Sequence, residues 1–453
     1  MYLQIVGVFM NINSLIILLK NYLWGWPLLL IIMGVGILAT LATNFVQVRY
    51  FFTAWRLLLF PKKSELGAQK GAALTPFQAF LGALGTSVGN GNIAGIATAI
   101  AYGGPGAGVW ILFAGFIGMA LRFAEVYLGV HFDKYEMRGV RGGPIAYLSH
   151  LPGKKFMPYV FALLFYFYAL TSGNAMQANA IGDAVYSTWG INKWIIASGI
   201  TLFLMYAIMG GAKRILRFSD ILTPFKVLVF FVSAIIVLTY HYQMIVPTLK
   251  LIFSSAFSYQ AVAGGAAGFT LQQIIKNGFA RTFNSTEAGF GVAASFFGAS
   301  GSQKPVNDSI ISMIGVFIST CFVCFLVAMV VVASGVWNNG AIGSALAVSA
   351  YQTVFGSYGG WVVTFVAASF GLGVMVAFLF IGKTGFFFLT NGRGEKWFYI
   401  IFCIVAFLGT KTKVEMIWDI NDLVNGILLL INLYAIVFFM PLLHKAIVNY
   451  KRQ

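Results

Sequence analysis

Long apolar stretches separated by short polar segments repeat along the whole chain. A transmembrane helix needs about 20 mostly apolar residues, and eleven stretches approach or exceed that length. They cover residues 24–45, 77–103, 107–130, 156–184, 193–211, 220–240, 263–295, 308–334, 360–382, 397–410 and 415–441. The pattern predicts an all-α, polytopic membrane protein with about eleven transmembrane helices. The short apolar run at 1–19 is expected at the interface or beside the first helix.

The second apolar stretch contains the sequence GTSVGNGNIAGIATAI at residues 85–100. Four glycines and two asparagines within residues 85–95 weaken a helix inside the membrane. Non-helical backbone at this depth persists only where it is buried in protein or lines a cavity. Secondary transporters use such broken helices to hold substrate and ions near the middle of the bilayer. We therefore expect a transporter.

Composition agrees with a membrane protein, because 59% of the residues are hydrophobic, only 9% are charged, and the mean hydropathy is +0.86. Soluble domains carry about 25% charged residues. The net charge of +17 does not indicate nucleic-acid binding, since the cations lie in short loops between apolar stretches. Cys321, Cys324 and Cys403 lie within apolar stretches and are expected to be packing residues. No metal-ligand cluster, cofactor motif, catalytic pairing or signal peptide is visible, so no enzyme is expected.

The Lys and Arg residues also predict the orientation, because cytoplasmic loops carry an excess of them. If the loop after the first stretch is cytoplasmic, the inside segments hold 20 of these residues and the outside segments hold 5. With an odd number of helices, the N-terminus then lies outside and the C-terminus in the cytoplasm. The chain is expected in the cell (inner) membrane, with the bilayer as its surroundings. Its oligomeric state is not indicated.

The chain shows a weak internal repeat. At an offset of 194 residues, GNGNIAG at 89–95 aligns with FNSTEAG at 283–289, so that Asn90 meets Asn284 and the Ala-Gly pair recurs. Five helices separate the two copies, and an odd number inverts the second copy in the membrane. We predict an N-terminal extra helix and linker (1–76), a first five-helix repeat (77–240), an inverted second repeat (241–441) and a basic cytoplasmic tail (442–453).

Several motifs resemble the alanine or glycine:cation symporter family, which has the leucine-transporter-type fold. They are GNIAGIATAI with GGPG (91–106), RFAEVYLGV (122–130), GGPIAYL (142–148), GNAMQAN (173–179), GGAKRI (210–215), STEAGFG (285–291) and WDINDLVNG (418–426). Their order and spacing cover most of the chain. The resemblance implies uptake of a small neutral amino acid, alanine or glycine first, coupled to sodium.

The resemblance also implies a site. Carbonyls of Gly85 and Val88 would serve one cation, and the Asn92 side chain would serve a second. Free N–H groups at the first break would face the substrate carboxylate, and Gln177 matches a family position that contacts substrate. The expected substrate-binding residues are Ser87, Gly89, Asn90, Gly91, Gln177, Ile181, Phe283, Ser285 and Phe378. For Gln177, the alternative is a hydrogen bond that only holds the helices together.

The chain departs from the family at the first cation site. Two family threonines fall on Gly373 and Val374, and a family tryptophan falls on Phe378. Sodium requires oxygen ligands, so the loss of both hydroxyls should weaken the site. Lys226 stands where the family usually has methionine. Its ammonium is expected either to replace the cation, with proton coupling, or to snorkel to the cytoplasmic surface.

Other charged residues lie within apolar stretches. Glu287, at the second break, is expected to pair with Arg281, with cation binding as the alternative. Arg122 and Glu125 lie three residues apart, which favours a structural ion pair near the cytoplasmic end of their helix. Asp422 matches a family position, and gating or packing are both open for it.

The sequence therefore predicts a secondary transporter for small neutral amino acids that works by alternating access. Sodium or a proton is the expected coupling ion. A proton-coupled or uncoupled carrier is the alternative that Lys226, Gly373 and Val374 favour. A transceptor that binds substrate without moving it is a further alternative. A channel is disfavoured, because no selectivity-filter motif appears.

Overall fold

The computed structural model describes residues 18–20, 22–60, 74–133, 136–153, 155–257, 271–412 and 414–451. Its α-helices are α2 (Trp26–Ala42), α3 (Val46–Arg49), α4 (Phe51–Leu59), α5 (Pro76–Ser87), α6 (Ile96–Gly103), α7 (Ala107–His131), α8 (Gly143–Ser149), α9 (Met157–Leu170), α10 (Met176–Trp189), α11 (Lys193–Met209), α12 (Gly211–Tyr240), α13 (Tyr242–Ser255), α14 (Leu271–Thr286), α15 (Val292–Gly298), α16 (Pro305–Phe317), α17 (Phe325–Ala333), α18 (Gly343–Phe355), α19 (Gly359–Thr390), α20 (Glu395–Gly409), α21 (Val414–Phe438) and α22 (Met440–Lys451).

Short segments of other geometry complete the described chain. Three π-helical segments continue α-helices, namely η2 (Gly91–Gly95), η3 (Thr171–Ala175) and η4 (Ile318–Cys324), and η5 (Gly356–Tyr358) is a 3-10 turn. The strands β1 (Glu136–Met137) and β2 (Val140–Arg141) form a small antiparallel hairpin. π-helical segments are rare and are frequent at functional sites. Here η2 and η4 contact each other.

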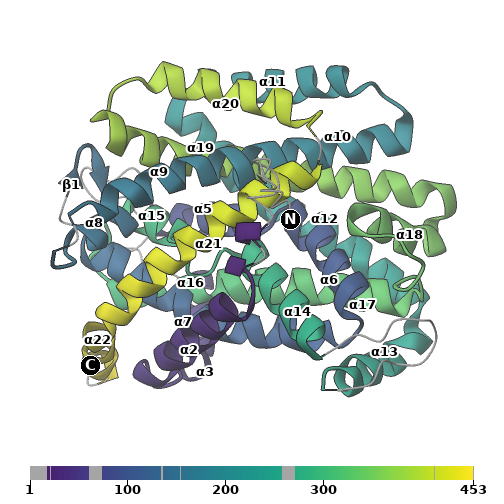
Figure 1. Ribbon diagram of the computed structural model, residues 1–453, viewed down its shortest axis with the longest axis horizontal. Helices are drawn as coiled ribbons and strands as arrows, with labels where there is room; N and C mark the ends of the chain where they lie inside the picture. The colour runs from purple at the N-terminus through teal and green to yellow at the C-terminus, as the bar shows by residue number, and fades with distance from the viewer. Residues whose placement is uncertain are drawn as a thin grey trace, which may run out of the picture.

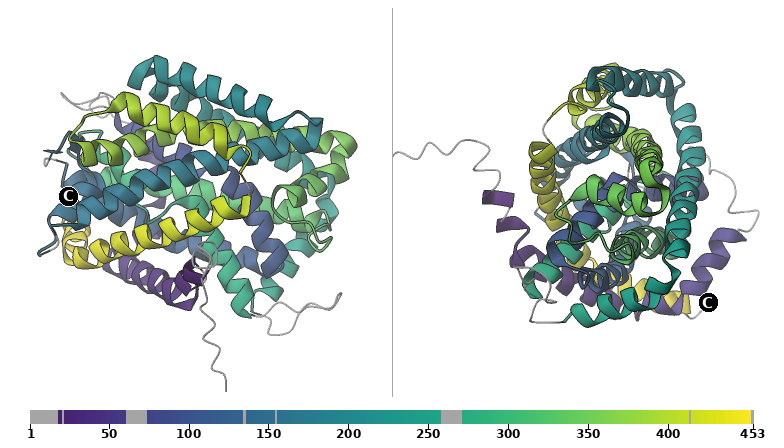
Figure 2. Two further views of the ribbon diagram at one scale, coloured as in Figure 1. Left: turned by 45° about the horizontal axis from the view of Figure 1, so that its top comes forward. Right: turned by 90° about the vertical axis from the view of Figure 1, so that its right-hand side faces the viewer.

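The helices form one bundle whose long axes run across Figure 1. The long helix α7 lies along the lower edge of that view, and α11 and α20 lie side by side along the upper edge. The helices α13 and α18 lie at one end of the bundle, and α8, the hairpin and the C-terminal α22 lie at the other. The end-on view in Figure 2 shows helices surrounding a packed centre.

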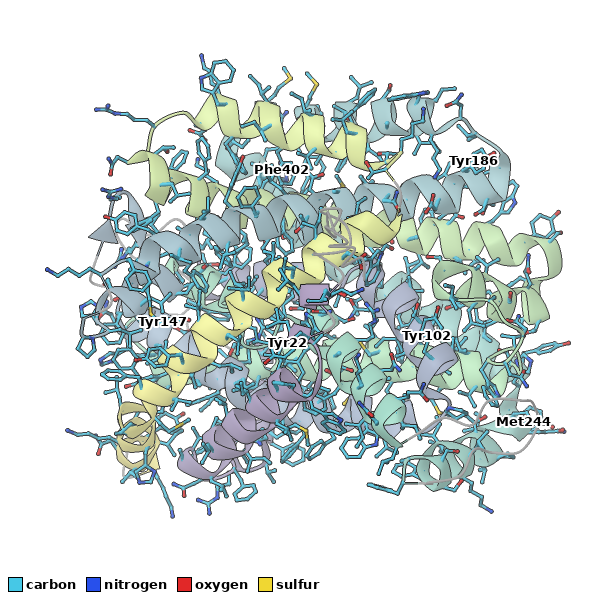
Figure 3. The ribbon with its side chains drawn as sticks, in the orientation of Figure 1. Tyr22, Tyr102, Tyr147, Tyr186, Met244 and Phe402 are labelled. Carbon is cyan, nitrogen blue, oxygen red and sulfur yellow. The ribbon has the colours of Figure 1, made fainter. Side chains whose placement is uncertain are left out.

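The surface of the bundle is apolar over large areas, as a lipid-facing surface requires. Tyr102, Tyr186 and Met244 are exposed, whereas Tyr147 and Phe402 are completely buried between helices (Figure 3). Within the described residues, six helices are long and apolar enough to cross a membrane by length and composition. The chain is therefore a multi-pass, nearly all-helical membrane protein.

Helices overlap all eleven of the predicted apolar stretches, including the short one at 397–410, where α20 lies. The run at 1–17 and the beginning of the seventh stretch, 263–270, lie outside the described residues, as do residues 452–453 of the expected tail. The first stretch forms α2, which packs on α7 and α21. Just before it, the Trp24 indole N–H donates to the backbone oxygen of Asp422 at 2.7 Å, which ties this segment to α21.

Candidate functional site

Two of the predicted transmembrane stretches are interrupted, and the interruptions fall at the two related motifs. The first helix ends with Ser87, passes through extended backbone at Val88 and resumes as η2 at Gly91. The second ends with Thr286 and resumes at α15 after residues with positive φ, namely Glu287 (54°), Gly289 and Gly291. Glycine adopts positive φ without strain. Each break therefore exposes the carbonyls of one half-helix and the N–H groups of the next.

Arg122 and Glu125 of α7 lie between the two breaks. The Arg122 guanidinium donates to the carbonyl of Thr286 at 2.6 Å and to Ser87 Oγ at 3.4 Å. The Glu125 carboxylate accepts the backbone N–H of Gly291 at 2.8 Å. The two side chains form an ion pair, with Arg122 Nε 3.3 Å from Glu125 Oε1, and both are buried. The predicted pair is thus present, and it lies between the two breaks.

The expected pairing of Glu287 with Arg281 is wrong. Glu287 is buried and accepts a hydrogen bond from the Tyr168 hydroxyl at 2.8 Å. Arg281 instead lies 4.0 Å from the Asp422 carboxylate and packs over the Trp418 ring. Arg281 and Glu287 are six residues apart, a spacing that does not bring two side chains to one face of a helix, and α14 ends between them at Thr286.

Lys226 lies in the middle of α12 and is completely buried. Its ammonium donates to the carbonyl oxygens of Gly85, at 2.7 Å, and Val88, at 2.5 Å. These carbonyls belong to the end of the first half-helix, where the helix dipole favours a cation. The side chain therefore does not snorkel to the surface. The ammonium occupies the two carbonyls that the resemblance assigns to a bound cation.

Gly373 of α19 leaves the space that Lys226 uses. A methyl group added at Gly373 would lie 3.2 Å from both Lys226 Cδ and Lys226 Nζ, closer than side chains normally pack. The Phe370 ring lies one turn earlier on α19, with its centroid 5.8 Å from Nζ. Val374 is buried and faces Gly89. A threonine at 373 would compete with the lysine for the same volume.

The second predicted cation position involves Asn92, whose side chain is fully engaged with its neighbours. Its Oδ1 accepts the backbone N–H of Gly89 at 2.8 Å, and its Nδ2 donates to Ser319 Oγ at 3.0 Å. Ser319, in the π-helical segment η4, in turn donates to the Ser87 carbonyl at 2.7 Å. These bonds stabilise the first break from the side of η4. The cation-binding role of Asn92 stays a prediction.

The predicted substrate residues converge on the first break. Gln177 Oε1 accepts the Asn90 N–H at 3.2 Å, and Gln177 Nε2 donates to the Ser172 carbonyl at 3.0 Å. Gln177 thus connects α10 to the break. A methyl group at Gly91 would lie 3.6 Å from Ser285 Oγ, so the two breaks approach each other there.

Asn90 carries one of the unsatisfied groups of this region. The side chain is buried, and among the described residues its Nδ2 has no hydrogen-bond partner. Gly371 and Ile181 flank it, since a methyl group at Gly371 would lie 2.9 Å from Asn90 Nδ2 and 2.6 Å from Ile181 Cδ1. A buried donor without a partner costs free energy. A ligand that accepts a hydrogen bond would remove that cost.

The two predicted aromatic residues, Phe283 and Phe378, pack against different neighbours. Phe283 is buried in α14 and stacks on Phe279, with ring centroids 5.1 Å apart. Phe378 packs on Gly173, where a methyl group would lie 2.0 Å from its ring, and makes an edge contact with Tyr168. Phe378 therefore lies beside the Tyr168–Glu287 pair.

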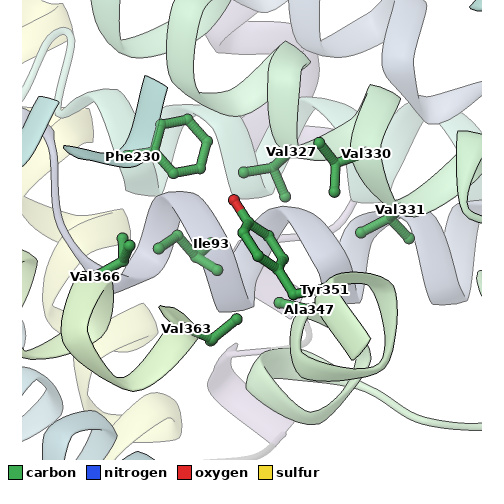
Figure 4. Close-up of a pocket in the computed structure, with 9 residues that line it drawn as sticks. All are labelled: Ile93, Phe230, Val327, Val330, Val331, Ala347, Tyr351, Val363 and Val366. Atoms are coloured by element: carbon green, nitrogen blue, oxygen red, sulfur yellow. The ribbon is translucent and has the colours of Figure 1, made fainter. Parts of the chain in front are cut away.

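An apolar cavity lies beside η2, on the other side of the break from α5. The Tyr351 ring is surrounded there by aliphatic side chains and Phe230 (Figure 4). The cavity encloses about 10 Å³, which leaves room for at most one water. The Tyr351 hydroxyl lies 3.1 Å from Ser233 Oγ, which ties α18 to α12. In this conformation side chains of α12, α17, α18 and α19 pack around Ile93 of η2.

The chain is similar to known transporters along most of its length. The model of the sodium:alanine symporter family matches residues 9–453. The chain belongs to this family. It is 33% identical over 432 residues to an uncharacterized transporter of Haemophilus influenzae, covering 94% of each chain. It is 30% identical over 436 residues to the sodium/alanine symporter AgcS of Methanococcus maripaludis, again covering 94% of each.

Solved structures of other transporters share the fold of this chain. MhsT in complex with L-phenylalanine superposes with a TM-score of 0.58 at 16% identity, covering 80% of this chain and 88% of that one. The fold is therefore the leucine-transporter type that the motifs implied. The family and its structural neighbours are membrane transporters, so the chain is a transporter and not an enzyme.

Several residues of the site in this family member were not predicted. Ser319 and Tyr168 lie in apolar stretches that hold other hydroxyl residues, such as Thr320 and Tyr166, and nothing in the sequence marks them as partners of the breaks. The role of Arg122 and Glu125 was visible only in part, because their three-residue spacing predicts the pair but not its contacts with Thr286 and Gly291. Their occurrence inside an apolar stretch was the available signal.

Proposed function

We propose that the chain is a secondary transporter for small neutral amino acids, alanine or glycine first, in which the Lys226 ammonium takes the place of a bound sodium ion and the proton is the coupling ion. The observation that carries this proposal is the pair of hydrogen bonds from Lys226 to the Gly85 and Val88 carbonyls. A sodium ion at the same carbonyls would compete directly with the ammonium.

The substrate class rests on the chemistry of the breaks. An amino acid brings a carboxylate, which accepts hydrogen bonds, and an ammonium, which donates them. Asn90 Nδ2 is a buried donor without a partner in the described chain, and the N-terminus of the half-helix at Gly91 favours a negative charge. One relative is the sodium/alanine symporter AgcS, which supports a substrate with a small neutral side chain.

Proton coupling follows from the position of the lysine. In its charged form, Lys226 holds the end of α5 to α12 through two hydrogen bonds. Loss of its proton removes the charge, weakens both hydrogen bonds and frees α5 to move relative to α12. Alternating access would then couple one proton to one conformational exchange around a fixed site.

The test is uptake of radiolabelled alanine into proteoliposomes, with sodium and proton gradients imposed separately. We expect the native chain to accumulate alanine under an inward proton gradient, with no response to sodium. Lys226→Met should abolish the proton response. Lys383→Met is the matched control, because it removes a lysine that pairs with Glu395 at the surface.

Two results would contradict the proposal. Accumulation driven by sodium in the native chain would show that the ion competes successfully with the ammonium. Saturable alanine binding without accumulation under either gradient would indicate a transceptor. Uptake of neither alanine nor glycine would refute these two substrates without testing the coupling. Uptake of other neutral amino acids under the same two gradients would then test the coupling on its own.

A further inference from the structure

A groove on the side of the bundle is unrelated to the substrate site. It encloses about 370 Å³, within the range of ligand pockets. The walls come from the short helices α3 and α4, from α7, and from the junction of α16 with η4. The lining is almost entirely apolar and includes Val48, Phe52, Leu112, Phe116 and Phe317.

The groove is open to the surroundings of the bundle. Phe52 is 83% exposed and Val48 is 57% exposed, so two of its walls project from the protein. Both residues closely follow the first predicted transmembrane stretch, so exposed apolar side chains here fit the boundary between the hydrocarbon and the head groups. The occupant of the groove must therefore be able to reach it from the bilayer.

A buried polar residue belongs to the lining, and two arginines follow it closely in the sequence. Gln47 lines the groove and is 3% exposed, and its Oε1 has no partner among the described residues, while its Nε2 donates to Thr40 Oγ1 at 3.0 Å. Arg49 and Arg56 are exposed on α3 and α4. A phosphate suits the arginines, and a head-group hydroxyl or ammonium suits the Gln47 oxygen.

We propose that this groove binds a phospholipid of the surrounding bilayer, with one acyl chain between α4 and α7 and the head group at Gln47, Arg49 and Arg56. The apolar walls fit the chain, the buried acceptor fits a head-group donor, and the arginines fit the phosphate. The proposal does not depend on Lys226 or on the transported substrate.

The bound chain would contact the part of the protein that supports the first break. Thr320 and Cys321 of η4 line the groove, and the preceding residue, Ser319, donates to the Ser87 carbonyl on the opposite side. Thr320 is completely buried and packs against Gly115, where a methyl group would lie 2.4 Å from Thr320 Cγ2. The lipid would thus touch Thr320, the neighbour of Ser319, whose hydrogen bond to the Ser87 carbonyl holds the end of α5.

The experiment uses the full chain in nanodiscs that contain a phospholipid with a photoreactive diazirine in its acyl chain. After illumination, adducts are mapped to peptides by mass spectrometry. We expect adducts to concentrate on residues 46–60, 112–119 and 317–321. Val48→Trp should fill the groove and lower labelling of 112–119 and 317–321 at least fivefold. Leu41→Trp is the matched control, since Leu41 is similarly exposed, at 54%, but lies outside the groove.

Each remaining outcome has a defined meaning. Adducts spread evenly over exposed apolar residues, or labelling in Val48→Trp equal to that in Leu41→Trp, would overturn the site. Arg49→Gln combined with Arg56→Gln should lower labelling at least threefold. Unchanged labelling in this double variant would show that the arginines do not hold the phosphate and would overturn the placement of the head group.

Discussion

A side chain at position 373 would press against Lys226. A methyl group there would approach the ammonium to 3.2 Å, and a threonine is larger still. The two departures from the family pattern therefore belong together, because the glycine provides the volume and the lysine provides the positive charge. Overpacking a buried site typically costs about 1–3 kcal/mol. A single reversal at either position is thus expected to be less favourable than a combined one.

The first prediction at the residue scale concerns this combination. Lys226→Met, Gly373→Thr and Val374→Thr together remove the ammonium and supply two hydroxyl oxygens. We expect this triple variant to gain a sodium-dependent rise in melting temperature, on the order of a few degrees, because an ion that binds only the folded state stabilises it. Thermal unfolding of the purified protein in sodium and in choline chloride measures the effect.

Two controls separate ion binding from repacking. Lys226→Met alone vacates the site without adding oxygen ligands, so its response to sodium should be much smaller. Gly373→Thr alone should lower the melting temperature in both salts, because the new side chain collides with Lys226. A native chain that is stabilised by sodium as strongly as the triple variant would refute the interpretation.

At the scale of elements, α7 connects the two broken helices through one buried ion pair. Arg122 contacts the ends of α5 and α14, and Glu125 contacts the beginning of α15. Asn432 of α21 reinforces the same region, because its Nδ2 donates to the Gly289 carbonyl at 2.7 Å. The missing helical hydrogen bonds at the second break are thereby replaced by side chains on neighbouring helices.

Removing one member of this pair should be severe. Arg122→Met leaves the Glu125 charge buried without its partner, and such changes cost about 3–5 kcal/mol. Arg122→Met with Glu125→Leu removes both charges and should recover most of that loss. The thermal stability of each variant in detergent measures the difference. Transport should stay low in the double variant, since the contacts with Thr286 and Gly291 are gone.

The comparison for this prediction is the surface pair of Lys383 and Glu395, in which Lys383 is 27% exposed. Lys383→Met should change stability by less than about 1 kcal/mol, because exposed ion pairs contribute little. If Arg122→Met were equally mild, the pair would not hold the breaks together.

The elements were predictable to different degrees. The apolar stretches predicted where the long helices lie, since length and hydrophobicity alone decide them. The first break was predictable from the glycines and asparagines at 85–95. The π-helical segments were not, because the mostly apolar sequence at 318–324, with Ser319 and Thr320, reads as ordinary helix. The helices α13 and α18 also escaped prediction, since they lie between the apolar stretches.

At the scale of the whole molecule, the site could be predicted where backbone groups form it and less where distant side chains do. The motifs located Gly85, Val88 and the second break, and Lys226 was a candidate because it is an isolated charge in an apolar stretch. Its hydrogen bonds required the packing of α12 on α5. The partner of Glu287 was predicted wrongly, because six residues separate it from Arg281 and a helix does not bring side chains at that spacing together.

The orientation of the molecule is the last prediction, and charge alone supports it. The two ends of the bundle are distinguishable by exposed residues: Lys155 precedes α9 near the hairpin end, and Asn338 lies in the turn between α17 and α18. An excess of Lys and Arg marks the cytoplasmic side. We expect Asn338→Cys to react with a membrane-impermeant maleimide in intact cells, and Lys155→Cys to react only after permeabilisation.

The native cysteines define the background of this measurement. Cys324 is buried, and Cys321 and Cys403 are partly buried within helices. A variant without them provides the parent for both substitutions. The reverse labelling pattern would show that the molecule has the opposite orientation in the membrane. It would also place Arg138 and Arg141, beside the hairpin, outside the cell, against the charge rule. Five of the predicted transmembrane stretches lie between positions 155 and 338. An odd number of crossings places the two positions on opposite sides of the membrane, so reaction of both cysteines from one side would contradict the predicted topology.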